Sequence, residues 1–325
     1  MKLLRRQFLH LAAGAGALPA LSRFARAQAY PSRPVRIIVG FGAGGTPDIN
    51  ARLIAQWLSE RLGQQFIIEN RPGAGGNIAA EAAMRAPADG HTLLWVNAAN
   101  AVSATLYDKL NFNLIRDIAP VAGVTHGPQV MEVLPSFPAK TVPEFIAYAK
   151  ANPGKINMAS SGTGNLSHVS GELFKMMTGV EMLHVPYRGA GPALNDLLSG
   201  QMQVMFDAMP SSIAHIRAGK LHPLAVTTAM RWEGLPDIPT VGDFVAGYET
   251  SVWSGIGTPR NTPTEFVDRL NKEINAGLAD SKIKARLLDL GGMVLAGSPA
   301  DFGKLIADET EKWGKVVKFA GIKPE

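Results

Sequence analysis

Residues 35–48 read VRIIVGFGAGGTPD: an apolar run, a glycine cluster and a helix start in direct succession. The apolar run VRIIV at 35–39 predicts a buried β-strand, and the glycines after it predict a tight turn. Thr46-Pro47-Asp48 is typical of a helix start, with Thr46 as the N-cap, Pro47 in the first helical position and an acid in the first turn. Apolar residues continue at helical spacing to about residue 62, where Gly63 ends the helix. The stretch therefore predicts a strand–turn–helix unit.

The same alternation of short apolar runs and helical patterns continues along the chain. We expect further strands at 66–69, 92–96, 155–160, 183–187, 202–207 and 224–228. We expect further helices at 142–150, 166–178, 190–199, 263–279 and 300–319. This alternation predicts an α/β fold in which the strands pair mainly in parallel. The length of 325 residues suggests two domains, although the composition marks no boundary between them.

The charge distribution excludes a nucleic-acid partner. The net charge of +5 is confined to the first 29 residues, which hold five basic side chains and no acidic ones. The remaining residues carry 27 basic side chains (32 less five) and 27 acidic ones, so the body of the protein is neutral. The chain contains no cysteine, which excludes disulfides, thiolate metal sites and cysteine nucleophiles.

Residues 1–29 are interpreted as an export signal. A basic start is followed by an apolar stretch at 9–21 and by Ala27-Gln28-Ala29, whose small residues suit a signal peptidase. We therefore expect cleavage after Ala29 and a mature protein that begins at Tyr30 and works outside the cytoplasm. Arg5-Arg6 is similar to a twin-arginine signal, and the general secretory route stays open as the alternative. No later segment is apolar enough to be a membrane span, so we expect the mature protein to be soluble.

The glycine-rich turn at 40–45 satisfies the pattern G-x-G-x-x-G, and Glu69 follows its last glycine by 24 residues. Taken literally, this is a dinucleotide-binding fingerprint. The helix start falls after the glycines, however, and a second glycine cluster at 73–76 follows the next strand. The more general prediction is a set of backbone N–H groups at a helix N-terminus, which suits an anion such as a carboxylate. A tight turn without a ligand remains the alternative.

A second polar turn, SSGTGN at 160–165, lies between a predicted strand and a predicted helix. It offers hydroxyl groups, an amide and backbone N–H groups, and His168 follows in the first helical turn. One interpretation is the other wall of an anion pocket, and the other is a capping turn with His168 exposed. Two anion-receptive turns, one in each half of the chain, suggest a cleft.

Motifs for catalysis and for metal binding are absent from the sequence. It has no G-x-S-x-G, no H-x-x-x-H or H-x-H pair, and no pair of acids flanking an obvious polar loop. We therefore expect no catalytic residue, no metal and no cofactor. Asp48 and Asp207 stand at element ends that could face a cleft, and Asp48 could equally be an acid favoured by the helix dipole.

Several motifs in a fixed order carry a family resemblance. They are FGAGGTPD at 41–48, ENRPGAGGN at 69–77, SGTG at 161–164, VPYRGAGPA at 185–193, LPDIPT at 235–240 and the ending KWG…AGIK at 312–323. With them the chain resembles the periplasmic solute-binding receptors of tripartite tricarboxylate transporters, the Bug receptors. The resemblance implies a two-lobed Venus-flytrap fold of the type II periplasmic-binding-protein kind, whose chain crosses between the lobes twice. Lobe one would be 30–127 plus 254–325, and lobe two 128–253.

The resemblance also implies the ligand and its site. Family members hold a carboxylate of a small organic acid on the first strand–helix loop, which maps to Phe41, Ala43, Gly44 and Gly45, with Asp48 nearby. The opposing loop maps to Ser161, Gly164, Asn165 and His168, and Asp207 ends a strand that looks across the cleft. Where many members have a Ser/Thr-containing turn after the third strand, this chain has Asn97-Ala98-Ala99-Asn100, which leaves the specificity for the far end of the ligand open.

The resemblance implies a non-enzymatic, monomeric receptor that delivers its ligand to membrane permease subunits. Two alternatives stay open: an exported oxidoreductase with a tightly bound dinucleotide, and a ligand-loaded sensor for a membrane kinase. The sequence does not decide between a dicarboxylate, an aromatic acid and an amino acid as ligand.

Overall fold

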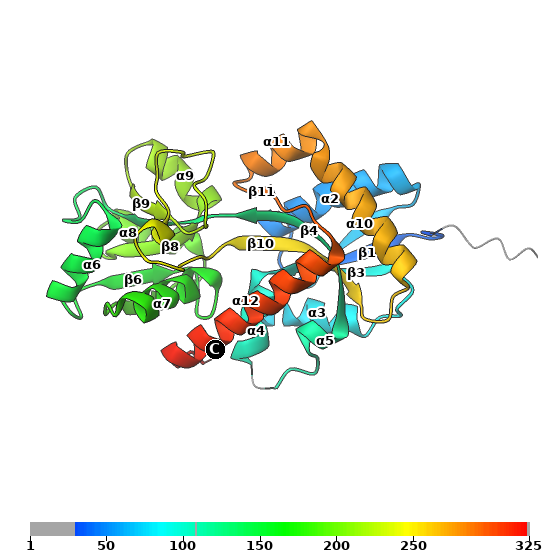
Figure 1. The fold of residues 1–325 in the computed structure, drawn as a ribbon, viewed down its shortest axis with the longest axis horizontal. Helices are drawn as coiled ribbons and strands as arrows, with labels where there is room; N and C mark the ends of the chain where they lie inside the picture. Colours follow the sequence, from blue (N-terminus) through cyan, green and yellow to red (C-terminus); the bar gives the residue numbers. More distant parts are fainter. Residues whose placement is uncertain (1–29, 108, 324–325) are drawn as a thin grey trace, which may run out of the picture.

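Two separate β-sheets, one in each lobe, organise the chain (Figure 1). The computed structural model describes residues 30–107 and 109–323. The expected export signal at 1–29 lies outside the described residues. Helices cover both faces of each sheet, so the molecule is a two-lobed α/β protein, as the sequence predicts.

The first lobe is built on a six-stranded sheet in the order β11-β4-β10-β3-β1-β2. Its strands are β1 (Val35–Val39), β2 (Phe66–Asn70), β3 (Thr92–Asn97), β4 (Ile118–Gly127), β10 (Val252–Pro259) and β11 (Met293–Val294). Its helices are α2 (Thr46–Leu62), the 3-10 turn η1 (Ala74–Gly76), α3 (Asn77–Met84), α4 (Ala98–Leu106), α5 (Leu114–Asp117), α10 (Thr264–Ala279), α11 (Ser281–Asp289) and α12 (Pro299–Ala320).

Strand β1 shows why this sheet needs helices on both faces. Val35, Ile37 and Val39 are fully buried in a core formed with α2, α10 and α11, whereas Ile38 is buried in a second core with α3, α4 and α12. A strand flanked by parallel neighbours and covered on both sides reads as a continuous apolar run, which is the pattern at 35–39.

The second lobe is built on a five-stranded sheet in the order β7-β6-β8-β5-β9. Its strands are β5 (Gln129–Val133), β6 (Asn157–Ser160), β7 (Leu183–Pro186), β8 (Val204–Ala208) and β9 (His222–Val226). Its helices are α6 (Val142–Ala151), α7 (Leu166–Thr178), α8 (Ala190–Leu198), α9 (Met209–Arg217) and the 3-10 turn η2 (Val241–Asp243). Helices α6 and α7 pack on one face of the sheet, and α8 and α9 pack on the other.

Both sheets are mixed, and in this respect the prediction of mainly parallel sheets is wrong. Strand β10 is antiparallel to β3 and β4, β11 is antiparallel to β4, and β5 is antiparallel to β8 and β9. The remaining pairings are parallel. The antiparallel strands are those that carry the chain between the lobes or close the sheet after it returns, so no βα crossover imposes a parallel direction on them.

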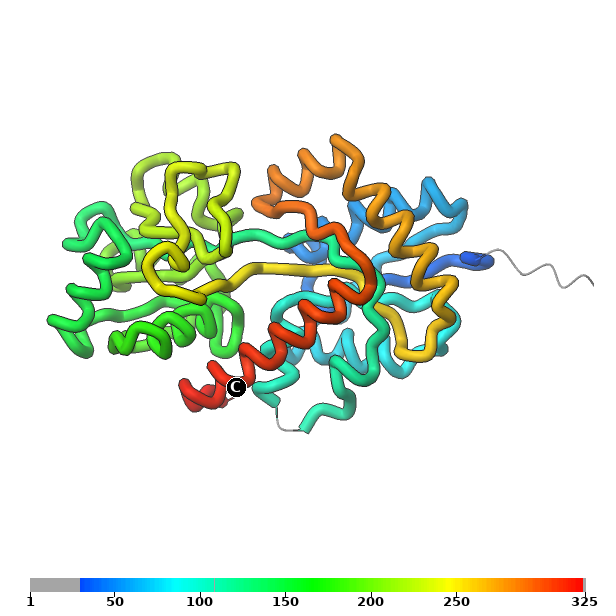
Figure 2. Tube along the Cα trace, in the orientation of Figure 1, coloured from blue at the N-terminus to red at the C-terminus, as the bar shows by residue number. Residues whose placement is uncertain are grey.

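The chain passes between the lobes along two paired strands, which Figure 2 shows side by side in the middle of the molecule. Strand β4 belongs to the first sheet and ends at Gly127. After one intervening residue, β5 begins in the second sheet at Gln129. Strand β10 returns and pairs with β4 from Val252 opposite Gly127 to Pro259 opposite Ile118. The indole N–H of Trp253 on β10 donates to Oε2 of Glu309 on α12 at 3.1 Å, and Trp313 donates to the same oxygen at 2.9 Å. Helix α12, which also packs against α7 of the second lobe, is thereby fixed to the crossing strand.

Most predicted elements are confirmed, with shifts of one or two residues at their ends. The helix predicted at 166–178 and the strand at 35–39 have the expected bounds. The N-cap of α2 is Gly45 rather than Thr46, so Thr46 and Pro47 are its first two helical residues. Strands β4, β5 and β10 were not expected, because their pairing partners lie far away in the sequence.

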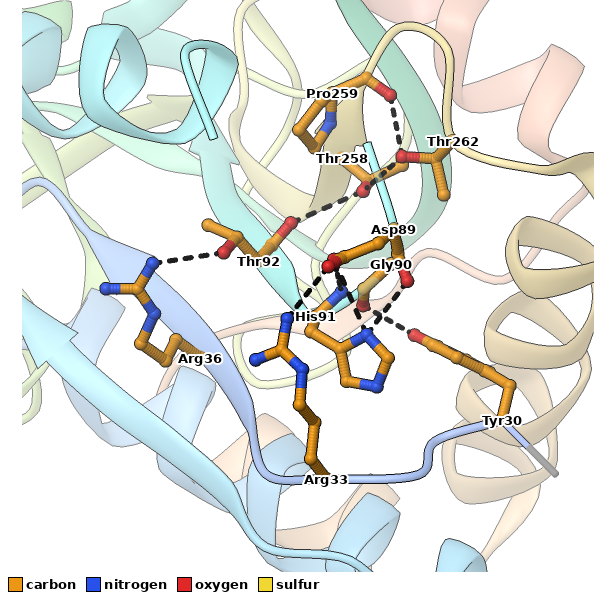
Figure 3. A network of polar contacts seen from close by, with 10 residues as sticks. All are labelled: Tyr30, Arg33, Arg36, Asp89, Gly90, His91, Thr92, Thr258, Pro259 and Thr262. Atoms are coloured by element: carbon orange, nitrogen blue, oxygen red, sulfur yellow. Dashed lines mark hydrogen bonds and ion pairs between the residues drawn. The ribbon is translucent and has the colours of Figure 1, made fainter. Parts of the chain in front are cut away.

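The start of the described chain is anchored at the edge of the first lobe (Figure 3). The hydroxyl group of Tyr30 donates to the carbonyl oxygen of Gly90 at 2.7 Å, and its ring stacks on Phe266 with the centroids 4.2 Å apart. Beside it, Arg33 pairs with Asp89 at 2.8 Å. Tyr30 is only 5% exposed, so the residue expected to begin the mature protein is part of the core.

This anchor generates a stability prediction. Tyr30→Phe should lower the free energy of unfolding by about 1 kcal/mol, because the buried carbonyl of Gly90 loses its donor. Tyr30→Ala should lower it by about 3 kcal/mol, because the stacked ring is lost as well. Urea unfolding of a chain that begins at Tyr30 measures both values. Equal stability of the parent and both variants would contradict the anchor.

Candidate functional site

A cavity of about 240 Å³ lies between the two sheets, at the ends of strands from both lobes. The six-stranded sheet and the turns and helices attached to it line it with Phe41, Thr46, Pro47, Asn50, Trp95, Asn97, Ala98, Ala99, Thr125, Val252, Trp253 and Ser254. The second lobe lines it with Gln129, Ser161, Asn165, Leu166, Ser167, Asp207 and Ala208. The volume is smaller than the roughly 300–1,000 Å³ of pockets that hold drug-sized ligands, so the cavity suits a small molecule.

Four helix N-termini meet at this cavity. Its lining includes the first turns of α2 and α7, the N-cap and first residues of α4, and the N-cap of α9. The N-caps of α2 and α9 are Gly45 and Ala208, which have no side-chain oxygen with which to cap their helices. Pro47 and Pro210 have no N–H group, and the N–H of Met209 donates to the carbonyl oxygen of Pro128 at 3.3 Å, so only the other first-turn N–H groups are left for an outside acceptor. The helix dipoles favour a negative charge there. None of the described residues that line the cavity is Lys, Arg or His.

The glycine-rich loop of the first lobe is held in shape by a buried carboxylate. Asp48 is 2% exposed, and its Oδ2 accepts hydrogen bonds from the backbone N–H of Gly44 and from Nε of Arg52, both at 2.9 Å. Its Oδ1 accepts from Nδ2 of Asn70 at 2.9 Å, and the same amide group donates to the carbonyl oxygen of Phe41 at 3.0 Å. The bonds from Arg52, Gly44 and Asn70 lower the pKa of Asp48 to about 2. Both carboxylate oxygens of Asp48 are thus bonded within the first lobe, an arrangement that fits the helix-start acid of the two roles expected for it.

The loop residues expected to bind a carboxylate do not all reach the cavity. Phe41 lines it, whereas Ala43, Gly44, Gly45 and Asp48 do not. Ala43, Gly44 and Gly45 are exposed, and Gly44 has a φ of +83°, a left-handed conformation that glycine adopts without strain. These three residues shape the turn that brings Thr46 and Pro47 to the cavity wall.

The polar turn of the second lobe is a connected network at the opposite wall. Nδ2 of Asn165 donates to Oγ of Ser161 at 2.6 Å, and the backbone N–H of Ser161 donates to Oγ of Ser167 at 2.8 Å. Asn165 is the N-cap of α7, where its side chain accepts from the backbone N–H of His168 at 3.2 Å. Ser161, Asn165 and Ser167 all line the cavity, so the network presents polar atoms to it in fixed positions.

His168 and Gly164 lie behind this turn rather than in the cavity. Nδ1 of His168 accepts from the N–H of Gly164 at 3.0 Å, and its ring stacks on His184 with centroids 3.5 Å apart. Its Nε2 lies 3.6 Å from Glu172. Burial opposes ionisation of Glu172, but the contacts from His168 and Lys175 outweigh it and lower the pKa of Glu172. His168 is 5% exposed, so the alternative of an exposed histidine is wrong: it supports the loop from inside.

Asn97 and Asp207 line the cavity from opposite lobes. Asn97 forms a capping box with Asn100, in which its side chain accepts from the N–H of Ala99 at 3.0 Å and its own N–H donates to the side chain of Asn100 at 3.0 Å. Asp207 is 2% exposed, and burial raises its pKa to about 6. It is the single ionisable side chain among the described residues of the lining.

Two cavity residues that the sequence did not suggest have unused polar atoms. Nε1 of Trp95 and Oδ1 of Asn50 are buried without a hydrogen-bond partner among the described residues. A buried donor or acceptor without a partner is costly, which marks both as groups that a ligand could satisfy. Trp95 belongs to a strand that is buried throughout, and Asn50 to an amphipathic helix, so no local pattern distinguishes them from core and surface residues.

The arrangement does not favour a dinucleotide site. Glu69, the acid expected to bind a ribose, is paired with Arg36 at 3.3 Å and with Arg71 at 2.6 Å and does not line the cavity. Within residues 30–107 and 109–323, no three His, Asp or Glu side chains cluster as metal ligands would. In the same part of the chain no helix is both long and apolar enough to cross a bilayer.

The family described as the tripartite tricarboxylate transporter family receptor matches residues 50–322. The chain belongs to this family. Among solved structures, R. palustris Rpa4515 with adipate is 40% identical, with a TM-score of 0.78, and the match covers 91% of this chain and all of the other. The periplasmic binding protein BugD is 34% identical with a TM-score of 0.75, over 91% of this chain and all of BugD. MatC from Rhodopseudomonas palustris with bound malate is 33% identical with a TM-score of 0.74, over 89% of this chain and all of MatC.

The Asp48 contacts predict a pH-dependent effect in this receptor. Asp48→Asn should lower the free energy of unfolding by about 1–3 kcal/mol near neutral pH, because the loop loses its charge-assisted hydrogen bonds. The pKa of Asp48 is lowered to about 2 in the folded protein, so its contribution is complete above pH 4 and is lost as the pH falls toward 2. Urea unfolding should therefore separate parent and variant at pH 7 and less at pH 3.

Asp237→Asn is the matched control, because Asp237 is exposed and its substitution removes the same charge. An Asp48→Asn variant as stable as this control at pH 7 would contradict the role given to Asp48.

Proposed function

We propose that this protein is an extracytoplasmic solute receptor that binds a small organic acid in the cavity between its lobes and delivers it to the permease subunits of a tripartite tricarboxylate-type transporter. The observation that carries the proposal is the meeting of four helix N-termini at a small cavity whose described lining contains no cationic side chain. Backbone donors and helix dipoles bind carboxylates without a buried Lys or Arg. Adipate and malate in the related structures support a carboxylate ligand.

The proposed contacts come from both lobes. Phe41 and Asn97 with the first turn of α2 form one wall, and Ser161, Asn165 and Asp207 form the other. We add Trp95 and Asn50, because their unpartnered polar atoms are directed to no other group among the described residues. Ala43, Gly44, Gly45, Asp48, Gly164 and His168 act through the shape of the two loops rather than through direct contact.

The proposed boundaries between the lobes lie where the chain leaves the first sheet after β4 and returns to it at β10. Lobe one is 30–127 plus 254–325, and lobe two is 128–253. Strand β10 begins at Val252, so its first two residues form the hinge at the second boundary. Closure of the lobes on the ligand would present one surface to the permease. We further propose that the chain is cleaved near Ala29, that it acts in the periplasm as a monomer, and that it has no enzymatic activity.

The charge of the ligand provides the first test. Adipate and malate should raise the melting temperature and bind in titration calorimetry, whereas their dimethyl esters should bind at least about tenfold more weakly, because each ester loses charge-assisted hydrogen bonds. Equal affinity of acid and ester would contradict an anion-binding cavity. Binding of NAD or flavin in place of the acids would support the dinucleotide alternative.

The indole N–H of Trp95 provides a second test. Trp95→Phe should weaken binding of the acid by about tenfold, because a donor to the ligand is lost. Trp232→Phe is the matched control: Trp232 is 3% exposed, its N–H also lacks a partner among the described residues, and it does not line the cavity. Calorimetric titration of both variants measures the difference. An equal loss of affinity in the two would exclude a direct contact by Trp95.

A further inference from the structure

Two buried acids share one hydroxyl group at the back of the cavity. Oγ of Ser212 lies 2.6 Å from Oε1 of Glu132 and 3.0 Å from Oδ2 of Asp207. Glu132 is on β5, Asp207 is on the neighbouring strand β8 opposite Val130, and Ser212 is in α9. Glu132 is completely buried, whereas Asp207 forms part of the cavity wall.

The geometry requires a proton in addition to that of the serine. A hydroxyl group has one proton, so Ser212 can donate to only one of the two carboxyl groups. The other short contact is a hydrogen bond only if that carboxyl group carries a proton and donates it to Oγ of Ser212. One consistent arrangement satisfies both contacts: protonated Glu132 donates to Ser212, and Ser212 donates to ionised Asp207.

Glu132 is the acid that keeps its proton. Its Oε2 is buried without a partner among the described residues, a position in which a negative charge has no compensation. Burial and the neighbouring Asp207 raise the pKa of Glu132 well above its usual value. Burial also raises the pKa of Asp207 to about 6, against hydrogen bonds from Ser212, from the backbone of Ala208 and from Ser211 that favour its ionised form, so Asp207 exchanges its proton near neutral pH.

Among the residues that the structure describes, no cation is paired with either acid. The other titratable side chains on the helices packed against β8 are His168, Glu172 and Lys175 on α7, Asp196 on α8, and His215 and Arg217 on α9. In the described part of the chain none of these forms an ion pair with Glu132 or Asp207. Across the cavity, Asp48 pairs with Arg52, and His126 on β4 faces an adjoining space.

The charges at the cavity match a dianion only when Asp207 is neutral. Each helix N-terminus is equivalent to roughly +0.5 elementary charge, so the four that meet here supply about +2. A dicarboxylate brings two negative charges, which balance that sum. An ionised Asp207 would add a third negative charge in contact with the ligand.

We propose that the cavity takes up one proton together with a dicarboxylate, and that Asp207, supported by Ser212 and a permanently protonated Glu132, holds this proton and donates a hydrogen bond to the ligand. The carboxyl oxygen of Asp207 that does not face Ser212 is the donor. The inference rests on the proposed function, since it specifies how the same cavity meets the far end of its ligand. Asp207 thereby determines specificity: it favours an acceptor at that end of the ligand over an ammonium group.

Calorimetric titration of the mature protein with adipate and malate tests the inference, using at one pH two buffers that differ in ionisation enthalpy. At pH 7.5 the parent should take up about one proton per ligand, and its affinity should fall by up to about tenfold per pH unit above pH 6. Asp207→Asn should take up no proton, and its affinity should be the same from pH 6 to pH 8. Glu132→Gln, which stays neutral, and the exposed control Asp237→Asn should both retain the uptake.

Binding by the parent without proton uptake would overturn the inference and leave the proposed function intact. Loss of uptake in Glu132→Gln with uptake retained in Asp207→Asn would also overturn it, because the exchanging proton would then belong to Glu132. If neither adipate nor malate binds, the proposed function fails for these two ligands. The proton site is then tested separately by carboxyl NMR titration of the free protein. One aspartate signal titrating near pH 6 and missing in Asp207→Asn supports the site, and the absence of such a signal overturns it.

Discussion

The antiparallel ladder between β4 and β10 connects the two lobes and fixes where the cavity lies between them. These strands belong to the first sheet, and their ends at Gly127 and Val252 are the points at which the chain leaves for the second sheet and returns from it. Because the two connections lie side by side, the lobes are joined along one edge, where β4 and β10 are paired. Thr125, Trp253 and Ser254 on these strands line the cavity, so the same ladder that joins the lobes forms the floor of the site.

The electrostatics of the cavity follow from this topology. In α/β units the chain turns from the carboxyl end of a strand into the N-terminus of a helix, and two sheets whose strand ends face each other bring several such turns together. Here α2 and α4 come from one lobe and α7 and α9 from the other. Their dipoles favour an anion in a cavity whose described lining has no cationic side chain, which suits a receptor that must release its ligand again.

How far the sequence predicts the structure depends on whether a signal is local. The units 35–62 and 157–178 are recognisable because an apolar run, a glycine or serine turn and a helical pattern follow one another directly. The β4–β10 ladder joins residues more than a hundred positions apart, and no local pattern specifies it. The same limit applies to the site: the two loops were predicted, but not that His168 points inward, that the indole N–H of Trp95 lacks a partner, or that Glu132 meets Asp207 through Ser212.

We propose that helix N-termini and backbone donors hold the acid between the lobes. A crystal structure of the mature protein with adipate would test this binding mode. We expect one carboxylate within hydrogen-bonding distance of the first turn of α2, the rest of the ligand in contact with Ser161 and Asn165, and the far carboxylate against Asp207. A ligand bound outside this cavity, or held by a Lys or Arg side chain within it, would exclude this mode of binding.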